Sequence, residues 1–216
     1  MIDFALLRRN MIEGQMRPNR VTEPALVEAL SRIPRESFVP EGLKANAYVD
    51  EDLPLGDGRF LTEPLVLARL IQAAGPGPGA TVLDIGGATG YGAAVLAELG
   101  VRVVALEESE TLARQARAVL GARAGSVDIV VGPLRAGWPG GAPYDAIIIE
   151  GGVVEVPPGL VDQLAEGGSL AAVLMGEGTG RLVRLTKQDG AVSRVDLHDA
   201  AVPLLEAFQP APTFVF

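Results

Sequence analysis

The stretch from Thr81 to Leu99, TVLDIGGATGYGAAVLAEL, constrains the fold of this chain more than any other segment. Val82–Ile85 is a short run, apolar except for Asp84, with the composition of a strand that is buried on both faces. A glycine-rich turn from Gly86 to Gly90 follows, and Tyr91–Leu99 then shows the spacing of apolar residues that is typical of a helix. Strand, turn and helix together predict the first βα unit of a doubly wound α/β sheet. In such sheets, ligands bind at the carboxyl ends of the strands.

The glycine turn narrows the class of ligand. A dinucleotide-binding turn needs glycines at its first, third and sixth positions. The frame that begins at Gly86 has Ala88 and Tyr91 at the third and sixth, and the frame that begins at Gly87 has Thr89 at the third, so neither fits. The nucleoside-binding turn of S-adenosylmethionine methyltransferases has the pattern acidic-x-Gly-x-Gly-x-Gly, which here reads Asp84, Gly86, Ala88, Gly90. Bare glycine backbone lets a ligand approach closely, and we expect Asp84 to interact with the ligand's ammonium group, directly or through water. A turn used only for packing is the alternative that this motif leaves open.

Two acidic residues follow the next predicted strand. Val101–Leu106 (VRVVAL) is apolar except for Arg102, and Glu107 and Glu108 come directly after it. An acidic side chain about 20 residues past the glycine turn can accept hydrogen bonds from both ribose hydroxyls. Together with the turn, these acids favour a cofactor that contains a nucleoside.

The remaining elements predict a mostly parallel sheet of seven strands behind an N-terminal helical cap. Further strands are predicted at 127–131, 144–149 and 170–175, with an antiparallel pair at 181–187 and 191–197. Helices are predicted at 2–17 and at 65–74, and a further helix is predicted to begin after Thr22, which serves as its N-cap. Residues 53–64 are predicted as a loop. We expect one domain over residues 1–216, in which 1–75 form the cap and the loop, 76–200 a Rossmann-like core and 201–216 an apolar C-terminal extension.

Composition excludes several functions. The chain has no cysteine, so it cannot form a disulfide, a thiolate nucleophile or a thiolate metal site, and we expect a cytoplasmic protein without a bound metal. A net charge of −9 argues against a nucleic-acid partner. No apolar run approaches the ~20 residues of a membrane span, and we expect no secretory signal or membrane partner. The single histidine, His198, has no partner pattern for catalysis.

Thr62 and Glu63 stand just before the helix predicted at 65–74. One of them can cap that helix. Alternatively, free backbone N–H groups and the Thr62 hydroxyl position an anion or the reacting group. The two interpretations are compatible.

Five separated segments occur in an order that is specific to one protein family. They are MIEGQMRPNRVTEPALVEALSRIPRESFVP, AYVDEDLPLGDGRFLTEPLVLARLIQAA, LDIGGATGYGAAVLAEL, GWPGGAPYDAIIIEGG and PPGLVDQLAEGGSLAAVLMG, which together span residues 11 to 176. The chain thereby resembles the protein-L-isoaspartate O-methyltransferase family. This resemblance implies the class I S-adenosylmethionine-dependent methyltransferase fold and S-adenosylmethionine as cofactor. It also implies methylation of the isoaspartyl carboxylate in damaged proteins or peptides, and it leaves the oligomeric state open.

The resemblance also implies site residues. Thr62 takes the position of the family's active serine, so it is the implied catalytic residue. The implied cofactor contacts come from the active-site loop, the glycine turn and the end of the second strand: Leu61, Thr62, Asp84, Gly86, Gly87, Ala88, Gly90, Tyr91, Glu107 and Glu108.

Departures from the family pattern leave two other functions open. The family's loop reads Gly-Gln-Thr-Ile-Ser-Gln-Pro, where this chain has Gly58-Arg-Phe-Leu-Thr-Glu-Pro64, so Glu63 adds a negative charge beside the acceptor site. Ala88 replaces a glycine, and Pro133 replaces an aspartate expected to contact adenine. The alternatives are a methyltransferase with another peptide or small-molecule substrate, and a non-catalytic S-adenosylmethionine-binding protein.

Overall fold

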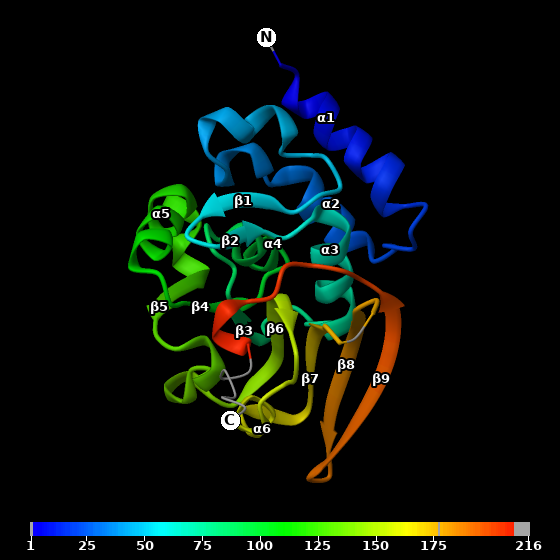
Figure 1. Ribbon diagram of the computed structural model, residues 1–216, viewed down its shortest axis with the longest axis vertical. Coiled ribbons are helices and arrows are strands. Elements are labelled where there is room, and N and C mark those ends of the chain that lie inside the picture. The colour runs from blue at the N-terminus through cyan, green and yellow to red at the C-terminus, as the bar shows by residue number, and fades with distance from the viewer. Residues whose placement is uncertain (1, 177, 210–216) are drawn as a thin grey trace, which may run out of the picture.

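The computed structural model describes residues 2–176 and 178–209, and it is built around a seven-stranded sheet (Figure 1). The strands lie in the order β5-β4-β3-β6-β7-β8-β9. All neighbouring pairs from β5 to β7 are parallel, and the last two pairs are antiparallel. The expected mostly parallel sheet is confirmed. Its strands are β3 (Thr81–Ile85), β4 (Arg102–Glu107), β5 (Val127–Val131), β6 (Tyr144–Val153), β7 (Leu164–Leu174), β8 (Arg181–Gln188) and β9 (Ala191–Asp199).

The direction of winding reverses at β3. The chain runs outward from β3 through β4 to β5 and then returns to β6, which pairs with the other side of β3. Strands β3 and β6 therefore flank the topological switch point, where open α/β sheets bind their ligands. Three helices connect these strands: α4 (Tyr91–Glu98), α5 (Glu110–Leu120) and α6 (Pro158–Asp162).

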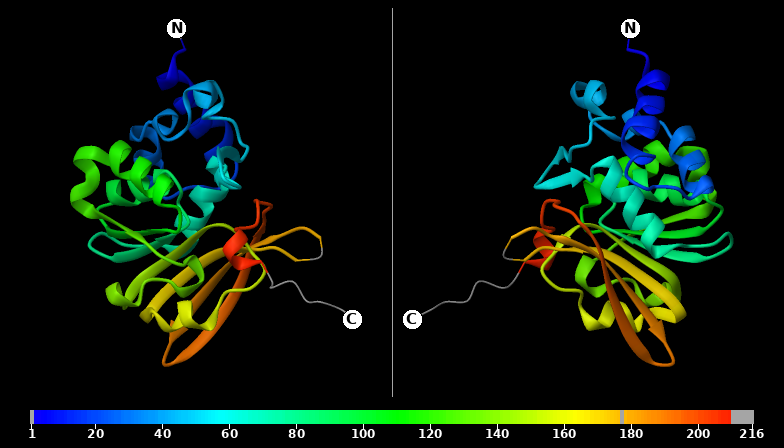
Figure 2. Two further views of the ribbon diagram at one scale, coloured as in Figure 1. Left: turned by 60° about the vertical axis from the view of Figure 1, so that its left-hand side comes forward. Right: turned by 90° about the vertical axis from the view of Figure 1, so that its right-hand side faces the viewer.

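The N-terminal residues form the expected helical cap (Figure 2). Helix α1 (Phe4–Met11) continues into a π-helical turn at 12–16, α2 spans Pro24–Arg32, and α3 spans Pro64–Ala74. The predicted N-cap at Thr22 is wrong. Glu23 holds the N-cap position with no side-chain cap bond, and the Thr22 backbone N–H donates to Gln72 Oε1 at 2.9 Å.

The prediction of a loop at residues 53–64 is wrong, because this segment contains a β-hairpin. Strands β1 (Leu53–Gly56) and β2 (Arg59–Leu61) pair antiparallel across a two-residue turn. Asp57 and Gly58 have φ values of 51° and 70°, as the mirror-image turns of tight hairpins require. The Asp-Gly pair is a recognised hairpin signal, so the sequence carried this information.

Strand β6 shows how the sheet separates two apolar layers. Ala146 and Ile148 face the layer that contains the cap helices, whereas Ile147 and Ile149 face the opposite layer. This strict alternation, with both faces buried, is typical of a central parallel strand.

The chain after β9 returns across the carboxyl ends of the strands (Figure 1). Leu204 bridges to Gly152 of β6, and the Leu205 N–H donates to Gly152 O at 2.9 Å. Phe208 is fully buried in the apolar layer opposite the cap. The first part of the predicted extension is therefore packed against the sheet, and residues 210–216 lie outside the described residues.

In the described residues, no helix combines the length and the apolar character that crossing a membrane requires.

Candidate functional site

The glycine turn between β3 and α4 lies at the carboxyl edge of the sheet. Gly86 and Gly90 have φ values of 77° and 87°, which favour glycine, and Ala88 adopts a similar conformation at 51°. An alanine there costs about 1 kcal/mol relative to glycine. A Cβ atom on Gly87 would lie 2.8 Å from Asp84 Oδ2, so close packing also requires glycine at that position.

Glu107 ends β4 directly beside this turn and is 3% exposed. Its Oε2 accepts a hydrogen bond from the Ala88 N–H at 3.1 Å, and its Oε1 accepts from the Glu108 and Ser109 N–H groups at 2.9 and 3.0 Å. The structure therefore brings together the turn and the acid that the sequence singled out. The Glu108 side chain, by contrast, is 37% exposed.

Arg59 is a site residue that sequence reasoning missed. It projects from β2, is 6% exposed, and forms an ion pair with Glu107 through Nη1. Its Nη2 donates to Gly86 O at 2.8 Å. The hairpin thus places a guanidinium group between the glycine turn and the acid at the end of β4.

A second buried acidic group lies across the switch point. Asp84 is fully buried, and Glu150 on β6 is 3% exposed. Among the described residues, both Asp84 oxygens and Glu150 Oε1 lack a hydrogen-bond donor. Burial first, and then the neighbouring carboxyl group, raises the pKa of Asp84 well above its usual range, and burial raises the pKa of Glu150 to about 7. The two carboxyl groups are therefore positioned to share one proton.

Gly92 makes room for Glu150. A Cβ atom at this position of α4 would lie 1.6 Å from Glu150 Oε1, so any larger residue collides with the carboxyl group. The sequence signal for Glu150 was an acid near the end of a buried strand. Only the pairing of β3 with β6 shows that this acid lies beside Asp84.

Thr62 is held from the cap side. It is 3% exposed, and its carbonyl oxygen accepts a hydrogen bond from Arg35 Nη2 at 2.7 Å. The fully buried Arg35 also donates to Ala47 O at 2.7 Å and lies 4.7 Å from the centroid of the Tyr91 ring. Tyr91 therefore contacts the cap, where its ring also packs against Phe38.

The helix start at α3 is not a free anion site. The Glu63 N–H donates to Asp52 Oδ1 at 2.9 Å, and the Leu65 N–H donates to Asp50 Oδ1 at 3.2 Å. The expectation of free N–H groups is wrong, because two aspartates from the preceding loop already accept from them. Of the two predicted cap residues, Glu63 holds the N-cap position and Thr62 does not, and the Glu63 side chain makes no cap bond.

Glu63 stands beside these aspartates. Burial first, and then the charges of Asp50 and Asp52, raises the pKa of Glu63 to about 7. At a pH below neutral, Glu63 is therefore mostly protonated and brings little negative charge to the loop.

A very small cavity lies between the hairpin, β6 and the C-terminal segment. Its volume is about 10 Å³, and its lining includes Arg59, Thr62, Glu150, Gly151 and Leu205. Leu205 packs tightly on the site, because a Cβ atom on Gly151 would lie 2.6 Å from its Cγ.

The polar groups of this site suit S-adenosylmethionine. Two unpartnered carboxyl groups, on Asp84 and Glu150, can face an ammonium group, Glu107 can face ribose, and the glycine turn leaves the backbone bare. Arg59 and Leu205 cover this set. A Cβ atom on Gly86 would lie 3.3 Å from Arg59 Nη2 and from Leu205 Cδ1.

The loop that follows Pro133, the position expected to contact adenine, is anchored by Trp138. The Trp138 N–H donates to Gln163 Oε1 at 2.8 Å, and its carbonyl oxygen accepts from the Tyr144 hydroxyl at 2.7 Å. The indole packs on the apolar layer opposite the cap, as a packing anchor does. Pro133, at the start of this loop, is exposed.

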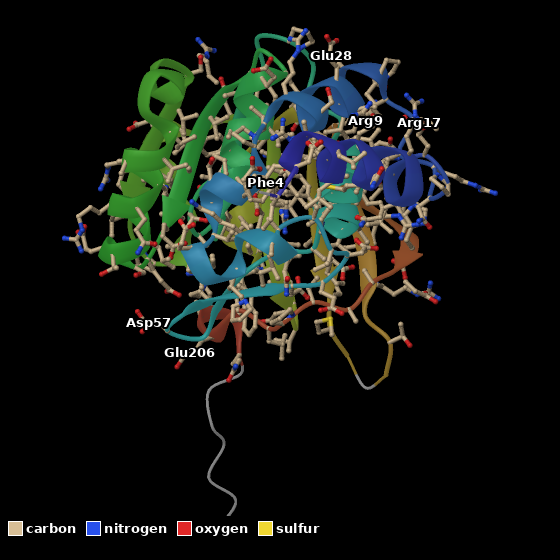
Figure 3. The ribbon with its side chains drawn as sticks, turned by 90° about the horizontal axis from the view of Figure 1, so that it is seen from above. Phe4, Arg9, Arg17, Glu28, Asp57 and Glu206 are labelled. Carbon is tan, nitrogen blue, oxygen red and sulfur yellow. The ribbon has the colours of Figure 1, made fainter. Side chains whose placement is uncertain are left out.

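A larger groove lies elsewhere, on the outer side of the cap. It has a volume of about 780 Å³ and is lined by Arg9, Arg17 and Glu28 among others. Figure 3 shows these three residues at the opposite side of the molecule from Asp57 and Glu206, which mark the hairpin turn and the C-terminal segment. The groove is therefore remote from the glycine turn and its acids. The described residues contain no group of His, Asp and Glu side chains that could hold a metal ion.

Comparison with known proteins gives a consistent result. The profile of the Protein-L-isoaspartate(D-aspartate) O-methyltransferase (PCMT) family matches residues 7–207. A protein-L-isoaspartate O-methyltransferase of Methylorubrum populi is 41% identical over 181 residues, which cover 84% of this chain and 85% of that protein. One of Methanoculleus marisnigri is 38% identical over 204 residues, which cover 93% of this chain and 92% of that protein.

Solved structures agree on the fold. A protein-L-isoaspartate O-methyltransferase superposes with a TM-score of 0.78 at 26% identity over 92% of this chain, and this chain spans 65% of that one. A putative protein-L-isoaspartate O-methyltransferase from Plasmodium falciparum, solved with S-adenosyl-L-homocysteine, gives 0.79 at 20% identity and covers 96% of this chain and 100% of that one. The class I methyltransferase fold expected from the sequence is confirmed.

Proposed function

Because this chain belongs to the protein-L-isoaspartate(D-aspartate) O-methyltransferase family, we propose that it is an S-adenosylmethionine-dependent carboxyl O-methyltransferase acting on isoaspartyl residues of damaged proteins. One observation of the structure carries this proposal. Glu107 meets the glycine turn at the carboxyl ends of β3 and β4, Arg59 contacts both, and Thr62 lines one small cavity together with Arg59. This is the place where an α/β sheet binds a nucleoside.

The chemistry needs few protein groups. When bound, S-adenosylmethionine supplies a methyl group that its sulfonium already activates. An isoaspartyl carboxylate is ionised at neutral pH and is itself the nucleophile, so the protein needs to align it and exclude water rather than supply a base. We assign alignment of the acceptor to Thr62, whose backbone Arg35 holds in place. Asp84 would hold the ammonium group of the cofactor, and Glu107 would hold its ribose.

A labelled-methyl assay tests the proposal. The protein is incubated with S-adenosylmethionine that carries a labelled methyl group and with an isoaspartyl peptide or its aspartyl isomer. We expect a base-labile label in the isoaspartyl peptide alone. Label in other substrates only would establish the second alternative, a methyltransferase of different specificity. Binding of S-adenosylhomocysteine without label in any substrate would establish the third, a non-catalytic binder.

Thr62 provides the first prediction. Thr62→Ala removes the hydroxyl that aligns the acceptor, so kcat should fall by about tenfold or more while the Kd for S-adenosylhomocysteine stays within about twofold. Thr62→Ser keeps the hydroxyl and should retain most of the turnover. Equal turnover in all three proteins would remove Thr62 from the mechanism.

The other expectations from the sequence stay predictions. They are the cytoplasmic location, the absence of a nucleic-acid partner, and the division of the chain at residues 75 and 200.

A further inference from the structure

The acid assigned to ribose already has a full set of partners. Glu107 accepts three backbone N–H bonds and forms an ion pair with Arg59 in which both side chains are almost fully buried, at 4% and 6% exposed. Ribose hydroxyls would need the same carboxylate oxygens. Arg59 Nη2 also donates a hydrogen bond to Gly86 O, on the glycine turn itself. The hairpin arginine and the cofactor ribose therefore compete for one position.

Arg59 also belongs to the acceptor side of the site. It lines the small cavity together with Thr62, and within the described residues it is the one cationic group in that lining. Arg35 also contacts Thr62, but it is fully buried, and its Nε and Nη2 donate to the backbone carbonyl oxygens of Ala47 and Thr62.

The charges around the cavity are otherwise acidic. Asp52 and Glu150 line it, and Glu63 follows Thr62 in the chain. An acceptor carboxylate that enters among these acids needs a cation close to it. A guanidinium group is well suited, because its planar fork of N–H donors matches a carboxylate.

We propose that Arg59 exchanges partners during the reaction: it holds Glu107 in the cofactor-free protein, and the ribose displaces it so that its guanidinium becomes the receptor for the acceptor carboxylate. This inference rests on the proposed function, and it assigns the recognition of the isoaspartyl carboxylate to one residue. The family's loop pattern has glutamine at this position, which offers Glu107 no opposite charge, so the exchange is particular to a chain with arginine here. The cofactor then enters first and the acceptor second.

The first experiment measures cofactor affinity. Calorimetry with S-adenosylhomocysteine compares the wild-type protein with Arg59→Gln and with Arg194→Gln, which removes an exposed arginine paired to Asp196 on β9. Breaking the Glu107 pair relieves the competition, so Arg59→Gln should bind about tenfold tighter, while Arg194→Gln matches wild type. Equal or weaker binding by Arg59→Gln overturns the proposal.

The second experiment measures acceptor affinity. Fluorescence anisotropy follows a labelled isoaspartyl peptide with and without saturating S-adenosylhomocysteine. The wild-type protein should bind the peptide about tenfold more tightly when S-adenosylhomocysteine is present, because only then is Arg59 free. Arg59→Gln should bind it weakly in both conditions, and Arg59→Lys should recover part of the affinity. Peptide binding that is unchanged by S-adenosylhomocysteine in wild type, or by Arg59→Gln in its presence, overturns the proposal.

The two proposals fail in different ways. If S-adenosylhomocysteine binds neither wild type nor Arg59→Gln, the cofactor assignment is wrong and the exchange falls with it. If it binds both with the same affinity, the exchange alone is wrong. Circular dichroism checks that each variant is folded. Should Arg59→Gln not fold, Arg59→Lys carries the first test, with a smaller gain in affinity because its ammonium cannot make the two-pronged contact.

Discussion

This protein has two buried acidic sites on neighbouring strands, a single glutamate and a pair of carboxyl groups, and they are stabilised in opposite ways. Glu107, at the end of β4, has a guanidinium partner and three backbone N–H donors. Asp84 and Glu150 lie on β3 and β6, and among the described residues no donor reaches either Asp84 oxygen or Glu150 Oε1. Both groups are almost inaccessible to solvent.

The difference shows how the fold divides its site. A buried charge needs a counter-charge and hydrogen bonds, and the hairpin supplies both to Glu107. Without a cation, two neighbouring buried carboxyl groups keep a proton instead, which raises their pKa values. The first arrangement resists disruption, whereas the second is sensitive to pH and suited to a cationic ligand group.

The largest effect should come from breaking the ion pair. Glu107→Gln leaves the Arg59 charge buried without its partner, so the free energy of unfolding should fall by about 3 kcal/mol. Urea denaturation measures this. The double variant Arg59→Gln/Glu107→Gln removes both charges and should recover part of the loss. A double variant no more stable than Glu107→Gln would mean that the buried charge is not the cause.

A smaller effect should come from the carboxyl pair. Because folding raises its pKa values, the pair contributes stability that is fully present below about pH 4 and is lost as pH rises toward 7 and above. Glu150→Gln offers Asp84 an amide donor in place of the shared proton, so it should flatten this pH dependence and stabilise the protein at pH 8 by about 1 kcal/mol.

Thermal unfolding between pH 5 and 8 checks this prediction, with Glu41→Gln as the control because the Glu41 side chain is 87% exposed. The control should follow the wild-type profile. A Glu150→Gln profile parallel to wild type would show that the pair does not titrate as a unit.

The smallest effect should come from Glu63, a half-buried acid at the rim of the same site. Its pKa of about 7 means that it gains charge as pH rises through neutrality, which repels the acceptor carboxylate. The KM for an isoaspartyl peptide should therefore rise by about threefold from pH 6 to 8, with kcat changing less. Glu63→Gln should keep the lower KM across this range. A wild-type KM that is independent of pH would exclude Glu63 from the approach of the acceptor.

Sequence reasoning was most successful where the signal is local. The strand at 127–131 was predicted to the residue, and the glycine turn and Glu107, which the sequence assigned to one cofactor, meet at the carboxyl edge of the sheet. It was wrong about the segment at 53–64, where an Asp-Gly hairpin signal lay among prolines and glycines. It was also wrong about the start of α3, because Asp50 and Asp52 reach its N–H groups from outside the helix.

The sequence by itself therefore determined the sheet, the turn and the acid beside it, because strand periodicity and glycine conformations act over a few residues. Only the tertiary structure decided the electrostatics of the site. Arg59 and Glu107 are 48 residues apart in the chain, and Glu150 meets Asp84 only because β6 pairs with β3. Such contacts depend on how the hairpin and strands pack together, and no local pattern encodes them. They distinguish a crevice closed by an arginine from an open one.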